Sequence, residues 1–82
     1  MLTSKCRMKI LKSLNRLGQL NVSEVAQRVG ANYKVVFEHL KALEDEAIIQ
    51  HREFGRTRLF RFNEVSPKAK AVQRLLETWE QE

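Results

Sequence analysis

The 82-residue sequence predicts a mainly α domain with one small β-hairpin, an α+β fold. Apolar residues recur at spacings of three and four in four separate segments, as they do on one face of a helix. Two β-type stretches flank the dipeptide Gly55-Arg56, which is typical of a hairpin turn. The predicted order is helix, short strand, helix, helix, strand, strand, helix, in a single domain over residues 1–82.

The first helix is predicted over Ser4 to Leu17 and ends at Gly18. Its apolar stripe comprises Cys6, Ile10, Leu14 and Leu17. We interpret the lone cysteine as a packing residue, with an intermolecular disulfide or redox role as the alternative. The outer face is basic and either is merely solvated or contacts a polyanion backbone; it consists of Lys5, Lys9, Lys12 and Arg16. A strand of one or two residues is expected within 19–22.

The stretch from Val22 to Leu43 predicts two helices joined by a sharp turn. We expect Ser23 to cap the first helix, and Gly30 to end it in the left-handed conformation that glycine adopts easily. Asn32 then caps a second helix over about 32–46. A short helix, a turn of three or four residues and a longer helix form a helix-turn-helix unit, whose second helix enters the major groove in DNA-binding examples.

A two-stranded hairpin is predicted from Ile48 to Phe54 and from Thr57 to Asn63. An isolated hairpin is marginal in water, so its apolar residues must pack on the helices. These are Ile48, Ile49, Phe60 and Phe62. The tip and flanks carry four arginines against the single acid Glu53, and we expect the tip to project from the body.

The last helix begins with Ser66 at the N-cap and Pro67 at the first helical position. Its apolar stripe runs through Ala69, Val72, Leu76 and Trp79, with Leu75 beside it. This stripe packs either on the first helix of its own chain or on a second subunit. We expect both, in a homodimer with residues 66–82 as the dimerisation helix. The predicted dimer contacts are Met8, Val72, Leu75, Leu76 and Trp79.

The charge is uneven. The formal net charge is +5, with twelve Lys/Arg against six Asp/Glu in residues 1–63 and three against four in residues 64–82. A basic excess in so small a domain favours a polyanionic partner. No apolar run approaches the ~20 residues of a membrane span, and no signal-peptide core is present. We expect an intracellular, nucleoid-associated protein that does not enter a membrane.

These elements together resemble the winged helix-turn-helix domain, and within it the small ArsR-like transcriptional regulators of archaea and their viruses. The resemblance covers about Cys6 to Trp79. The helix-turn-helix pattern of that family is matched by Val25-Ala26, Val29-Gly30, Asn32, Val35-Val36, His39-Leu40-Lys41, Leu43 and Ile48-Ile49. The wing pattern is matched by Gly55-Arg56 and Phe60-Arg61-Phe62. Ala47 stands where the family usually has glycine, and Phe37 and Glu38 depart from its small or basic groove residues.

The resemblance implies a homodimeric regulator that binds a specific double-stranded DNA site, for example as a repressor. Its recognition-helix contacts would be Asn32, Tyr33, Lys34, Phe37, Glu38 and Lys41, and its wing contacts (within 51–61) would be Arg52, Arg56, Thr57, Arg58 and Arg61. Phe37 is equally interpretable as a core residue. His39 is better interpreted as a hydrogen-bonded structural histidine than as a phosphate contact.

Two other functions stay open: a protein–protein interaction module and a sequence-neutral architectural DNA-binding protein. An enzyme is not expected, because the sequence contains no catalytic constellation and no phosphate-binding glycine loop. No cofactor or metal is expected either. The family's metal-sensing members carry cysteine or histidine ligand motifs that this chain lacks, since it has one cysteine and two histidines.

Overall fold

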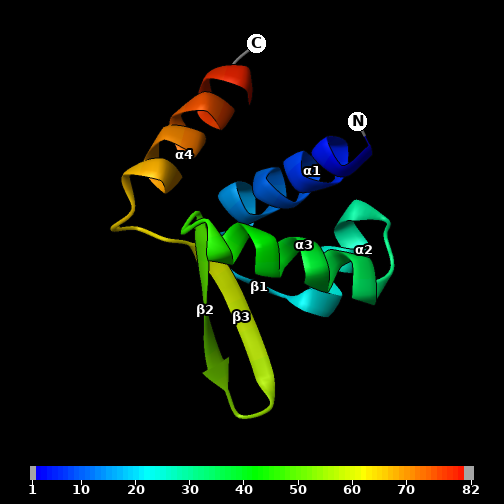
Figure 1. The fold of residues 1–82 in the computed structure, drawn as a ribbon. Helices are drawn as coiled ribbons and strands as arrows, with labels where there is room; N and C mark the ends of the chain where they lie inside the picture. Colours follow the sequence, from blue (N-terminus) through cyan, green and yellow to red (C-terminus); the bar gives the residue numbers. More distant parts are fainter. Residues whose placement is uncertain (1, 81–82) are drawn as a thin grey trace.

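The computed structural model describes the backbone of residues 2–80 and the side chains of residues 5–79. Residues 81 and 82, the end of the predicted dimerisation segment, lie outside the described residues. The elements are α1 (Leu2–Leu17), β1 (Leu20–Asn21), α2 (Val22–Val29), α3 (Tyr33–Asp45), β2 (Ile49–Phe54), β3 (Thr57–Phe62) and α4 (Pro67–Glu80). The predicted order of elements is confirmed (Figure 1).

The three strands form one antiparallel sheet in the order β1-β3-β2. Phe62 pairs with Ile49 on one side, and Phe60 pairs with Leu20 on the other. The hairpin was predicted as two-stranded; the structure adds β1 as its third strand. This pairing joins residues about forty positions apart, so local sequence patterns do not reveal it.

The core lies between the three N-terminal helices and the inner face of the sheet. Six of its residues are fully inaccessible to solvent and come from five elements, α4 included: Ile10, Val25, Val36, Leu40, Phe60 and Ala69. The predicted apolar stripes are therefore confirmed, except at the ends of the first and last ones. Leu17 is 43% exposed and Trp79 is 51% exposed, and each stands in the last turn of its helix.

The start of α2 differs from the prediction. Asn21, not Ser23, is the N-cap: its side chain accepts a hydrogen bond from the Glu24 backbone at 2.8 Å. The Glu24 carboxylate in turn accepts from the Asn21 backbone N–H at 2.9 Å, which completes a capping box. The helix therefore starts at Val22 and buries that side chain, while Ser23 is exposed.

The end of α3 contains a residue in an unusual conformation. Ala47 has φ 63°, a left-handed value that is costly for a residue with a Cβ atom. Its N–H donates to the Glu44 carbonyl, and the Ile48 N–H donates to the Leu43 carbonyl. This is the Schellman arrangement, in which glycine is the favoured residue. The position where the family usually has glycine is thus one that does require left-handed backbone.

The last helix begins as predicted, since the Ser66 hydroxyl accepts a hydrogen bond from the Ala69 N–H at 3.3 Å. Ala69 and Leu76 are buried in the core of the same chain. In Figure 1, α4 extends beside α1 at the end of the molecule away from the hairpin tip. Within the part of the chain that the structure describes, none of the helices is long and apolar enough to cross a membrane.

Candidate nucleic-acid interface

One face of α3 is available for contact with a partner. Gly30 closes α2 at φ 72°, and the Asn32 side chain caps α3 by accepting from the Val35 N–H at 2.9 Å. The chain therefore turns sharply, and Tyr33 at the start of α3 is 57% exposed. The polar residues at helical spacing behind it are also exposed; they are Lys34, Glu38 and Lys41.

The wing, defined as the β2–β3 hairpin, contacts α3 through an aromatic cluster. The rings of Tyr33 and Phe37 stack with centroids 6.4 Å apart and an interplanar angle of 10°. The Arg58 guanidinium lies 5.6 Å from the centroid of the Phe37 ring, within the range of a cation–π contact. Its Nε lies 3.8 Å from the Glu53 carboxylate on the paired strand. The wing is therefore held beside α3.

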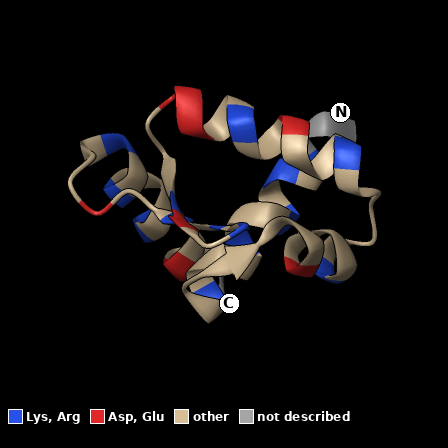
Figure 2. Ribbon diagram, turned by 90° about the horizontal axis from the view of Figure 1, so that it is seen from below, with Lys and Arg blue, Asp and Glu red and all other residues tan. Residues whose placement is uncertain are grey.

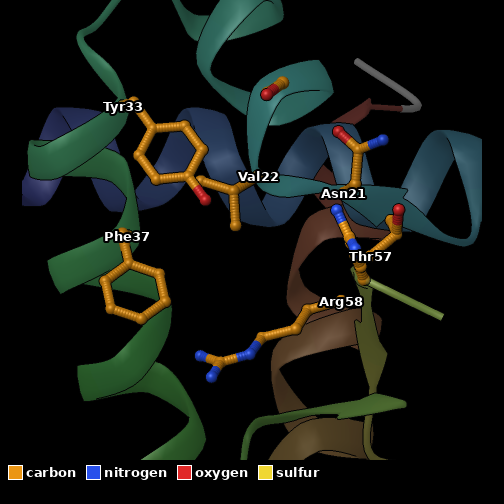
Figure 3. Close-up of a pocket in the computed structure, with 8 residues that line it drawn as sticks. Asn21, Val22, Tyr33, Phe37, Thr57 and Arg58 are labelled. Atoms are coloured by element: carbon orange, nitrogen blue, oxygen red, sulfur yellow. The ribbon is translucent and has the colours of Figure 1, made fainter. Parts of the chain in front are cut away.

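Beside this contact, a hollow of about 400 Å³ lies between the wing and α3. Its lining combines arginines, aromatic rings and the first residues of α2: Asn21, Val22, Ser23, Tyr33, Phe37, Arg56, Thr57 and Arg58. Figure 3 shows the Tyr33 and Phe37 rings on one wall and the Arg58 side chain reaching toward them from the wing. Phe37 is half-buried: it packs partly on the core and also lines the hollow. Its surroundings therefore fit both its interpretation as a core residue and its interpretation as part of the contact face.

The structure brings three of the five predicted wing contacts together. Arg56, Thr57 and Arg58 line the same hollow, at and beside the turn where Gly55 adopts φ 60°. Arg52 is exposed and pairs with Leu59 across the strands. Arg61 lies elsewhere: it lines a different hollow beside the end of α1 and α4, and its Nε is buried without a hydrogen-bond partner. The structure therefore does not bring Arg61, predicted to support phosphate contacts from the wing, together with Arg58, which lies three residues away on the opposite face of β3.

Contacts of two histidines, His39 within α3 and His51 in β2, join α3 to α1 and to the wing. His39 is 9% exposed, and its Nδ1 accepts a hydrogen bond from Arg7 Nε of α1 at 3.2 Å. The Glu44 carboxylate near the end of α3 contacts both the backbone N–H and Nδ1 of His51 in β2. The interpretation of His39 as a hydrogen-bonded structural residue is supported, and Glu44 and His51 join the helix to the wing.

Charge on the side to which the wing tip points is mixed. Figure 2 views the molecule from that side and shows basic positions on several elements, with acidic positions among them. On α3 itself, Lys34 and Lys41 alternate with Glu38, and Glu44, Asp45 and Glu46 follow near its end. Among the described residues, no group of three or more His, Cys, Asp or Glu is arranged to hold a metal ion.

The predicted dimer residues fall into two groups. Leu75 and Trp79 on α4 are 58% and 51% exposed, and the Lys12 ammonium lies 5.7 Å above the Trp79 ring. Met8 and Val72 are half-buried and pack on the core. Leu76 is only 1% exposed, so its predicted role as a dimer contact is wrong: the side chain is already buried within its own chain.

The hollow has a third wall that was not predicted from the sequence, made by Asn21, Val22 and Ser23. The available signal was the Asn21-x-x-Glu24 spacing of a capping box, which marks Val22 as the first helical residue. That the start of α2 faces the wing depends on the pairing of β1 with β3, which no local pattern indicates.

This arrangement of helices, three-stranded sheet and wing is the winged helix-turn-helix fold, and solved structures confirm it. HlyU from Vibrio cholerae has a TM-score of 0.79 and 23% identity, with coverage of 95% of this chain and 82% of that one. Mb0332 from Mycobacterium bovis, described as a homodimeric DNA-binding domain and a possible ArsR-family regulator, has a TM-score of 0.78, 21% identity and coverage of 98% and 71%. The Zα domain of PKZ from Carassius auratus, in complex with Z-DNA, has a TM-score of 0.69, 16% identity and coverage of 76% and 98%.

At the level of sequence, residues 2–66 match the model of the HVO_A0114 family, and the chain belongs to this family. The match includes everything from α1 through the wing and ends just before α4. A comparison with curated proteins finds no match.

Proposed function

We propose that this protein is a DNA-binding transcription regulator, in which α3 enters the major groove and the wing follows the neighbouring backbone or minor groove. The observation that carries the proposal is the shared hollow between the two elements. Exposed Tyr33 stands on one wall and the cationic side chains of Arg56 and Arg58 stand on the other. A DNA duplex is complementary to this arrangement, because base edges line its grooves and phosphates that attract cations flank them.

The residues divide into two roles. Lys34, Glu38 and Lys41 project from α3, where a lysine can donate to guanine and a glutamate can accept from a cytosine amino group. The wing arginines contact phosphates, or enter a narrow minor groove, and supply affinity more than sequence preference. This division predicts that changes on α3 alter the preferred sequence and changes on the wing weaken all sequences.

We further propose a homodimer that binds a palindromic site in the cell's nucleoid and represses by occupying it. The exposed Leu75 and Trp79 on α4 are the apolar residues that a second subunit would cover. Two recognition helices related by a two-fold axis would meet half-sites about 34 Å apart. The dimeric state of Mb0332, a protein of the same fold, is consistent with this assembly.

A random-sequence selection on the purified protein, followed by titration of the selected duplex at several salt concentrations, tests the proposal. We expect affinity to fall steeply with salt and the selected duplex to bind more tightly than random duplexes. The Arg56→Ala/Arg58→Ala variant should bind both the selected and the random duplexes more weakly, and its salt slope should be lower by about 1 to 2. The control is Lys70→Ala/Arg74→Ala, which removes two exposed charges from α4.

The outcomes separate the alternatives. Equal affinity for selected and random duplexes favours an architectural protein. Absence of duplex binding at low salt, with a left-handed duplex included because the Zα domain was solved with Z-DNA, favours a protein–protein module. Unchanged affinity of the wing variant removes the wing from the contact surface.

A further inference from the structure

A second cationic surface lies on α1, apart from the hollow between wing and recognition helix. Lys9, Lys12 and Arg16 follow one another at spacings of three and four, so they share the outer face of the helix. Arg28 in the last turn of α2 joins them along a second hollow of about 380 Å³. The remaining lining residues are Ser13 and Leu17, and the two hollows have no residue in common.

Acids neutralise this surface poorly: Glu24 lines a neighbouring hollow with Arg28, but among the described residues no ion pair joins the two. The sequence contains no Asp or Glu before Glu24, whereas the first 23 residues hold five Lys or Arg. Within residues 5–79, no carboxylate lies within 4.0 Å of the charged groups of Lys9, Arg16 or Arg28. All three side chains are exposed. Like charges gathered in this way repel one another, and the cost is relieved when a polyanion binds.

The position of α1 in the fold leaves this surface accessible when a duplex is bound at α3 and the wing. In Figure 1 the wing tip points to one end of the molecule and α1 lies toward the opposite end, with α3 between them. A duplex seated on α3 and the wing therefore leaves the α1 face free. The proposed dimer would cover Trp79 and so border this face at Lys12, which lies over the Trp79 ring. A second copy of this chain is a poor occupant of the rest of the face, at Lys9, Arg16 and Arg28, because it would bring two sets of cations together.

We infer that the surface formed by Lys9, Lys12, Arg16 and Arg28 binds the phosphate backbone of a second duplex, so that the protein bridges two DNA segments. The inference rests on the proposed DNA-binding function. Contact through lysine and arginine to phosphates carries no sequence information, so any duplex would serve as the second segment.

A capture assay tests this inference. A biotinylated duplex is loaded on beads, the protein is added, and retention of a fluorescent second duplex is measured. Affinity for a short single duplex is measured in parallel. The variant is Lys9→Gln/Arg16→Gln, and its matched control is Lys70→Gln/Arg74→Gln, which also removes one exposed lysine and one exposed arginine from a helix.

We expect the wild type and the control to retain the second duplex. The Lys9→Gln/Arg16→Gln variant should retain at least fivefold less of it, while its affinity for a single duplex stays within twofold of the wild-type value. Equal retention by the variant overturns the inference, and so does a parallel loss of retention and single-duplex affinity. A wild type that binds one duplex but captures no second one overturns bridging alone, whereas one that binds no duplex overturns the proposed function as well. Binding to vesicles of anionic lipid that needs Lys9 and Arg16, without duplex capture, assigns the surface to membranes instead.

Discussion

The guanidinium of Arg58 lies 5.6 Å from the ring centroid of Phe37, so a wing residue rests on a residue of α3. Phe37 in turn stacks on Tyr33, which continues the contact to the exposed start of α3. A hairpin tip without such a contact would be free to swing about its strands. The cluster therefore fixes the angle between the two elements proposed to bind DNA before any DNA arrives, which lowers the ordering cost of binding.

The coupling between these two residues is measurable by a double-mutant cycle. Arg58→Lys keeps the charge but loses the planar contact, and Phe37→Leu keeps an apolar side chain but loses the ring. We expect a coupling free energy of about 0.5–1 kcal/mol in denaturant unfolding. The cycle of Arg56→Lys with Phe37→Leu is the control and should be additive; additivity in both cycles would contradict the contact.

The N-cap of α2 is tested by comparing two neighbouring substitutions. Asn21→Ala removes the side-chain acceptor of the Glu24 N–H and should lower the free energy of unfolding by about 1 kcal/mol. Ser23→Ala should change it by less than about 0.5 kcal/mol, because the exposed serine has no capping role. Urea denaturation of both variants decides, and the reverse ranking would restore Ser23 as the cap.

Position 47 offers a stabilising change. Ala47→Gly relieves the left-handed strain at φ 63°, while the greater freedom of glycine in the unfolded chain offsets part of the gain. We expect the free energy of unfolding to rise by about 0.5–1 kcal/mol. Ala42→Gly, within the ordinary backbone of α3, is the control and should destabilise. Thermal and urea denaturation measure both, and a destabilised Ala47→Gly variant would argue against the strain.

Substitutions of the adjacent Leu75 and Leu76 on α4 distinguish an effect on folding from an effect on dimerisation. Leu76→Ala should cost about 2–4 kcal/mol of stability, since its side chain is buried in the core. Leu75→Ala should leave monomer stability nearly unchanged but weaken the proposed dimer in analytical ultracentrifugation. A dimer as tight as wild type in Leu75→Ala and in Trp79→Ala would move the interface to another surface.

Much of the architecture was predictable because its signals are local. Gly30 and Asn32 mark the turn, and Ser66 and Pro67 mark the start of α4, since each residue type satisfies a backbone requirement at its own position. One error concerns a local signal: Ser23 was expected to cap α2, although the Asn21-x-x-Glu24 spacing of a capping box marks Asn21 as the cap. The pairing of β1 with β3 was not predicted, because it joins segments about forty residues apart.

The candidate site shows the same division. Tyr33, Lys34, Arg56 and Arg58 were predicted from the helix-turn-helix and hairpin patterns, but the Asn21–Ser23 wall and the separate location of Arg61 were not. The burial of Leu76 and the exposure of Leu75 were likewise unpredictable, because both belong to apolar rows of α4 and only its packing against α1 distinguishes them.

The sequence by itself determined the order and approximate positions of the helices, turns and strands and that the chain is basic, because backbone caps, side-chain periodicity and charge act within a few residues. Only the tertiary structure decided that the wing stands beside α3 with Arg58 over Phe37, and that a second basic surface gathers around α1. Both depend on contacts between distant segments, which form when burial of the shared core compensates the entropy lost on bringing those segments together.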